Sequence, residues 1–321
     1  MGLLDGGFPT PGGPCWDWHC PEGDPMLRAL ILPIALALPG LPASGLAETT
    51  AEIPVETHAA PGSIMAVERP ALHALFQAMG LYDVIEIMSI EGVDYADELE
   101  TDMFPGQGGA AWPAMVGQIY GVERLITDFE AAIPADALTD GEMADLADFF
   151  TSETGQRVVA GEVIARREIM DPVVEEAANI IYAEELEAQN PRLRLLETFN
   201  DANALLDLNV AGAMNSNYAF YRGLVDGGAF DVQLPEELML AEIWGQEPEI
   251  RAETMVWLYS YQLMAYDELS DDEMQAYIDL SETPAGQALN RVLFAAFDVM
   301  FEAVSYELGA AAALFVAGEE T

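Results

Sequence analysis

An internal repeat constrains the fold of this chain more than any other feature. Residues 138–156 (LTDGEMADLADFFTSETGQ) align without gaps on residues 269–287 (LSDDEMQAYIDLSETPAGQ). Seven of the nineteen aligned positions are identical, and they fall where a helix would begin and where it would break. Such self-similarity indicates two copies of one structural unit.

Each copy of the repeat has the residues needed to start a helix and then to end it. A Ser or Thr followed three residues later by Glu is a capping box, in which each side chain bonds the other's backbone N–H. A Gly eleven or more residues further on permits a tight turn. The predicted motif comprises Thr139, Glu142, Gly155 and Gln156 in the first copy and Ser270, Glu273, Gly286 and Gln287 in the second.

The pattern of apolar residues predicts an all-α protein. No stretch alternates Val, Ile and Thr with polar residues at the period that strands require. Apolar residues instead recur at intervals of three and four, most clearly over 285–308. Pro70 and Pro191 suit the first turn of a helix. We therefore expect two related helical units, 70–190 and 191–317, packed around a pseudo-twofold axis into one bundle-like body.

Within the first unit, Gly and Pro residues set the bounds of the expected helices. We expect helices over 70–79 and 82–103, a Gly-rich loop over 104–111 and a helix over 112–133. The capped helix should reach about residue 150, and a long helix, bent at Pro172, should run from 156 to 188.

The N-terminal region has the organisation of an exported protein. Residues 26–47 combine an Arg, a short apolar run and small residues before Glu48, which is typical of a cleaved signal peptide. An uncleaved anchor is the alternative. Residues 1–25 are acidic, unlike a signal start, so we interpret them as untranslated or discarded. They hold the only two cysteines, Cys15 and Cys20. Residues 48–69 are expected to form a linker or arm.

The charge balance excludes several classes of function. The chain has 56 acidic residues against 11 basic ones, all of them Arg, for a net charge of −45. Such a surface repels nucleic acid and anionic lipid headgroups. Without Lys there is no phosphate-binding loop of the Walker type and no Schiff-base nucleophile. Cationic partners or divalent ions remain compatible with this charge, and a merely solubilising surface is the alternative.

The repeat motif also resembles a known family. In the domain of unknown function 2059 family, a short helix ends in an aromatic pair and a turn with Gly and Gln, followed by a long helix. Phe149, Phe150, Gly155 and Gln156 match that pattern in the first copy. In the second copy, Thr283, Pro284, Gly286 and Gln287 match the turn, whereas Leu280 and Ser281 replace the aromatic pair. The resemblance implies an exported helical protein of bacterial envelopes and brings no agreed activity.

Few residues qualify as a functional site. The segment 215–223 (NSNYAFYRG) is the most polar and aromatic, and Tyr and Arg favour interfaces. From it we select Asn217, Tyr218, Tyr221 and Arg222 as the candidate binding surface. No metal motif, cofactor motif or catalytic constellation is present in the sequence.

Three functions follow, in order of preference. The first is a periplasmic, or else secreted, protein-interaction or chaperone-like module that docks an unknown envelope protein, with no stable membrane insertion. The second is a binder of divalent cations or polycations. The third is a hydrolase that uses Asp or Glu, which would need two converging carboxylates in a cleft.

Overall fold

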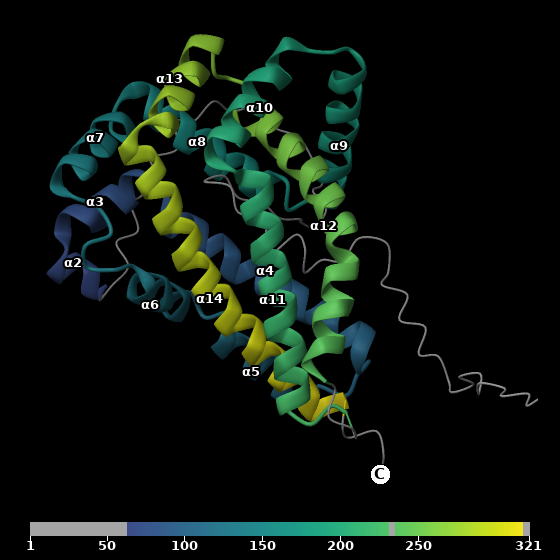
Figure 1. Ribbon diagram of the computed structural model, residues 1–321. Coiled ribbons are helices and arrows are strands. Elements are labelled where there is room, and N and C mark those ends of the chain that lie inside the picture. Colours follow the sequence, from purple (N-terminus) through teal and green to yellow (C-terminus); the bar gives the residue numbers. More distant parts are fainter. Residues whose placement is uncertain (1–62, 231–234, 317–321) are drawn as a thin grey trace, which may run out of the picture.

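The computed structural model describes residues 63–230 and 235–316, and within these ranges the chain is helical with no strand (Figure 1). The all-α prediction is therefore confirmed. The predicted signal peptide, the segment 1–25 and both cysteines lie outside the described residues.

The first half of the chain forms helices α2 to α9 (Figure 1). Their bounds are α2 Ile64–Glu68, α3 Pro70–Ala78, α4 Leu81–Met103, α5 Ala111–Ile119, α6 Val122–Ala132, α7 Asp140–Phe150, α8 Glu153–Glu168 and α9 Pro172–Glu187. The second half forms longer helices: α10 Pro191–Asn203, α11 Leu205–Asp226, α12 Glu236–Ala265, α13 Asp271–Glu282 and α14 Pro284–Val316.

Both predicted capping boxes are present. At the start of α7, Oγ1 of Thr139 accepts from the N–H of Glu142, and the Glu142 carboxylate accepts from the N–H of Thr139 at 2.8 Å. At the start of α13, Ser270 and Glu273 make the same two bonds. Each cap satisfies backbone donors that a helix start would otherwise leave unpaired.

The turn that follows each capped helix is held in the same way in both copies. Nε2 of Gln156 donates to the carbonyls of Phe150 and Ala78, the second of which ends α3. Nε2 of Gln287 donates to the carbonyls of Ser281 and Ala202, near the end of α10. The Gln side chain thus ties each turn to the helix that opens its half of the molecule.

Glycine is required in the first turn of the helices that follow, α8 and α14, because the backbones touch. A Cβ at Gly155 would lie 2.0 Å from the carbonyl oxygen of Phe149, and one at Gly286 would lie 2.2 Å from that of Leu280. Real side chains do not tolerate such distances. The two identical glycines are therefore explained by sterics.

Helix α14 is the centre of the core. Its Phe297 lies 4.5 Å from Phe129 of α6, and its Phe315 lies 5.1 Å from Phe104 between ring centroids. Buried residues from both halves join in one hydrophobic cluster. By length and composition alone, α14 could also cross a membrane, but half of its apolar window is buried inside the molecule. A core helix of a soluble protein has the same properties.

Helices α11 and α14 run parallel and in contact (Figure 1). Gly223 of α11 approaches the carbonyl of Tyr306, and Gly309 of α14 approaches that of Phe220, so closely that a Cβ would lie 2.1 Å and 2.2 Å away, respectively. Near the other end, Nδ2 of Asn290 donates to the carbonyl of Asn203 at 2.9 Å. The glycine contact joins the later parts of α11 and α14, and the Asn290 contact joins α14 to Asn203, the last residue of α10, just before α11 begins.

Three expected elements differ from the structure. The helix expected over 112–133 is two helices, because the chain leaves α5 at Tyr120 and restarts at Gly121. The long helix expected over 156–188 is also two, because Asp171 caps a new helix whose first residue is Pro172. Part of the expected linker forms α2.

The two copies also meet crosswise. Arg157 of α8 forms an ion pair with the capping residue Glu273 of the second copy. Arg291 of α14 lies close enough to the capping residue Glu142 of the first copy to lower its pKa, in addition to the larger effect of the Thr139 hydrogen bonds. These two contacts join the copies in both directions, and the pseudo-twofold axis stays a prediction.

Candidate functional site

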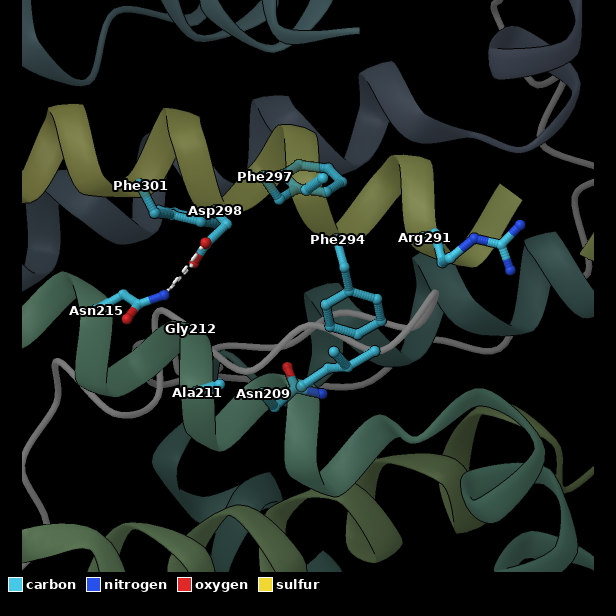
Figure 2. A pocket seen from close by; sticks show the side chains of 11 residues that line it. Asn209, Ala211, Gly212, Asn215, Arg291, Phe294, Phe297, Asp298 and Phe301 are labelled. Carbon is cyan, nitrogen blue, oxygen red and sulfur yellow. Dashed lines mark hydrogen bonds between the residues drawn. The ribbon is translucent and has the colours of Figure 1, made fainter. Parts of the chain in front are cut away.

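A pocket of about 260 Å³ opens between α11 and α14 (Figure 2). It lies between the contact of Asn290 with Asn203, the last residue of α10, and the glycine contact of α11 and α14 at Gly223 and Gly309. The lining consists of Leu208, Asn209, Ala211, Gly212 and Asn215 from α11 and Arg291, Phe294, Ala295, Phe297, Asp298 and Phe301 from α14.

The pocket exists because large and small residues face each other. Helix α14 contributes three Phe side chains, of which Phe297 and Phe301 are buried and Phe294 is half-buried. Opposite them, α11 presents Ala211 and Gly212, whose side chains are too small to fill the space. The wall is consequently apolar and aromatic.

A buried acceptor lies at the edge of this aromatic wall. Asn209 is 1% exposed, and its Nδ2 donates to the carbonyl of Leu205 at 2.7 Å. Its Oδ1 has no hydrogen-bond partner among the described residues. Buried polar atoms are nearly always hydrogen-bonded. The pocket therefore has, just beneath its wall, an acceptor that lacks a donor among the described residues.

Charged groups stand at the two ends of the pocket (Figure 2). Nδ2 of Asn215 donates to both carboxylate oxygens of Asp298 at 3.2 Å. Asp298 also adds to the effect of desolvation in raising the pKa of Glu302, one turn further along α14. Arg291 marks the opposite end and is exposed.

The predicted binding residues extend this surface in part. Tyr218 and Arg222 continue the helical spacing of Leu208, Ala211 and Asn215, so they lie on the same side of α11. The Arg222 guanidinium lies 5.9 Å from the ring centre of Tyr218 and 6.0 Å from that of Tyr306 on α14.

Hydrogen bonds to acidic residues hold both tyrosines in place. The hydroxyl of Tyr218 donates to Glu236 at 2.6 Å, and that of Tyr306 donates to Asp226 at 3.1 Å. The structure thus brings Tyr218 and Arg222 together with a residue that the sequence did not single out. We call this combined surface, from Arg291 and Leu208 to Tyr306 and Arg222, the α11–α14 seam.

The other two predicted residues, Asn217 and Tyr221, lie apart from the cluster of Tyr218, Arg222 and Tyr306. Asn217 is 5% exposed and lies beneath the surface. Tyr221 is half-buried, with its ring 6.5 Å from that of Phe220. A binding role for any of the four residues stays a prediction.

A second polar cluster is buried between α4, α8, α12 and α13. Arg166 donates to Glu91 at 2.5 Å, and both side chains are almost fully buried. One turn earlier on α8, the Glu162 carboxylate accepts from the hydroxyls of Tyr266 at 2.7 Å and Tyr277 at 3.3 Å. Burial raises the pKa of Glu162 to about 8. The α11–α14 pocket includes neither carboxylate.

Metal and histidine chemistry find little support in the described residues. No group of three or more His, Cys, Asp or Glu there could hold a metal ion. His73 is buried against the ring of Tyr82 at 5.1 Å, and its Nε2 has no hydrogen-bond partner in this part of the chain. His58 lies outside the described residues.

These features define an all-helical protein whose recognisable element is a capped helix, a Gly–Gln turn and a second helix. Residues 127–184, which extend from the end of α6 into α9, match the family described as uncharacterized protein conserved in bacteria (DUF2059). The resemblance expected from the sequence is confirmed for the first copy of the motif. The searches of curated proteins and of solved structures found no match for this chain.

Proposed function

We propose that this protein is an interaction module of the bacterial cell envelope that docks another protein on the α11–α14 seam. The observation that carries the proposal is the combination of an aromatic pocket with the exposed Arg222 between the half-buried rings of Tyr218 and Tyr306 on one continuous surface. Aromatic and Arg side chains around an anchor pocket are typical of the residues that dominate binding energy at protein interfaces.

The size of the pocket supports a protein partner. Pockets for drug-sized ligands and cofactors usually measure about 300–1,000 Å³. At about 260 Å³, this pocket lies just under that range and suits a side chain presented by a partner. The rest of the seam would then contact the backbone and flanking residues of that partner.

Photo-crosslinking in the living cell tests the proposal. A photo-reactive residue replaces Ala211, which is exposed and lines the pocket, and in a matched strain it replaces Ala183, which is exposed on α9. Amine-reactive reagents are unsuitable because the chain has no Lys. We expect one discrete protein adduct from position 211 and none from 183. Equal adducts, or none at 211, would contradict the proposal.

The envelope location is tested separately. The signal peptide predicted at residues 26–47 would leave a mature chain that begins at Glu48. N-terminal sequencing of the protein from a periplasmic fraction is expected to start there. A cytoplasmic chain that retains residues 26–47 would contradict the export step without affecting the seam.

The hydrolase alternative is favoured by the pKa values of two carboxyl groups, Glu162 and Glu91, which burial raises to about 8 in each case. A catalytic pair must also face a substrate. Glu162 and Glu91 are both buried, and the α11–α14 pocket contains the single carboxylate of Asp298. The interaction module therefore accounts better for the accessible chemistry.

A further inference from the structure

We infer that the α11–α14 pocket takes an aromatic side chain with an N–H or O–H donor, presented by a basic segment of the partner. This inference rests on the proposed function and deepens it by stating the chemistry of the occupant. Three features of the pocket lead to it: its walls, its unpaired acceptor and its charge.

The walls select an apolar, flat occupant. Phe294 points from α14 toward α11 (Figure 2), and Phe297 and Phe301 complete the aromatic lining on the α14 side. Aromatic side chains gain from contact with such walls through area burial and through ring-to-ring geometry. An Ala or Ser would leave most of the roughly 260 Å³ empty.

The unpaired acceptor selects a donor on that occupant. Oδ1 of Asn209 lacks a partner among the described residues, and the residue is almost fully buried. An apolar side chain that entered without a donor would leave this oxygen desolvated and unpaired. Neighbouring side chains cover this oxygen, so an indole N–H or a phenol O–H satisfies it once the entering ring moves them aside.

The negative charge around the pocket favours basic residues next to the aromatic side chain in the partner's sequence. The protein carries a net charge of −45, and Asp298 and Glu302 lie along the α14 side of the pocket. Arg291, at the far end, lies close to Glu142. Asn209 is separated by six residues, or about 9 Å along α11, from Asn215, which holds Asp298. An extended peptide covers that distance in about three residues. A basic residue two or three positions from the anchor would therefore reach Asp298.

Titration calorimetry with synthetic peptides on the full chain tests the inference. The probe has one central Trp with Arg at the second and third positions on both sides. Matched peptides replace Trp by Leu, Trp by 1-methyltryptophan, or every Arg by Glu. We expect the probe to bind and both Trp replacements to bind roughly threefold to tenfold more weakly, the usual value of one hydrogen bond. The Glu peptide should not bind.

Protein variants locate the binding. Asn209→Leu removes the acceptor and should abolish the difference between Trp and 1-methyltryptophan. Asp298→Asn should weaken the probe and reduce its dependence on salt, because one ion pair is lost. Gly212→Leu should block the pocket, whereas Gly245→Leu on α12, where no atom lies within 4 Å of a new Cβ, is the matched control. The methylated peptide keeps the donor test valid even if Asn209→Leu fails to fold.

The outcomes distinguish failure of the inferred occupant from failure of the proposed function. Equal binding of the Trp and 1-methyltryptophan peptides, or binding of the Glu peptide, overturns the inference. So does failure of the probe to bind. If a discrete adduct still forms from position 211, the interaction module stands and only the occupant is wrong. If neither peptide binding nor an adduct is found, both proposals fall.

Discussion

At the scale of single residues, an unusual group is the buried carboxyl of Glu162. Its pKa is raised to about 8 chiefly because the side chain is desolvated, against the opposing effect of hydrogen bonds from Tyr266 and Tyr277. The same group in the unfolded chain has its ordinary pKa of 4.5. Between these two values the folded state binds more protons than the unfolded state, so stability is lost as the pH rises.

The pH dependence of Glu162→Gln tests this carboxyl group. The variant keeps an acceptor for both tyrosines but cannot ionise. We expect the free energy of unfolding of the parent protein to fall by up to about 1 kcal/mol per pH unit more steeply than that of the variant between about pH 5 and pH 8. Urea titrations across this range measure the two slopes. Parallel curves would mean that Glu162 is not protonated in the folded protein.

At the scale of elements, the α11–α14 pair contains two glycines with opposite roles. A Cβ at Gly212 would meet only Asp298, at an ordinary 3.8 Å, whereas one at Gly223 would lie 2.1 Å from the carbonyl oxygen of Tyr306. Gly212 leaves the pocket open, and Gly223 lets the two backbones touch.

Alanine at each position should therefore change stability in opposite directions. Gly212→Ala should raise the free energy of unfolding by roughly 0.5–1 kcal/mol, because Ala is the better helix former. Gly223→Ala should lower it by about 1–3 kcal/mol, the usual cost of overpacking. Chemical denaturation of the two variants decides the matter. Destabilisation by Gly212→Ala would indicate that the helices lie closer at the pocket than described.

At the scale of the whole molecule, the dominant property is uncompensated negative charge. The net charge of −45 opposes the compact state, and salt screens that repulsion. We expect the melting temperature to rise by several degrees with NaCl, and CaCl₂ at matched ionic strength to give the same rise. The part of the chain that the structure describes has no cluster of metal-binding side chains. A larger rise with CaCl₂ would instead support the cation-binding alternative.

The sequence predicted local structure well at positions where a single physical reason requires a particular residue type. Thr139 and Ser270 cap helices, and Gly155 and Gly286 lie in the first turn of the next helix, where a Cβ cannot fit. Helix ends were missed where the local residues do not by themselves specify a break. Tyr120 ends a helix just before Gly121, although apolar residues at helical spacing continue on both sides, and Pro172 starts a helix where a bend was expected.

The candidate site was predicted only in part, because it is a property of two helices together. The spacing of Tyr218 and Arg222 could be read from the segment itself. The pocket requires Ala211 and Gly212 to face Phe294 of a helix about eighty residues later, and no local pattern specifies that pairing. The same holds for Arg166, whose buried partner Glu91 lies on a different helix.

The central position of α14 has a consequence for how the protein can be made. This helix follows in the chain all the other helices that it packs against, and its rings complete aromatic contacts with Phe129, Phe104 and Trp112 of the first half. During synthesis the first half emerges from the ribosome long before α14, the helix that completes its core. A nascent chain halted before residue 284 would therefore hold an open core, and final consolidation must wait for a late, long-range docking step. The order in which the ribosome delivers the helices thus delays folding until most of the polypeptide is free.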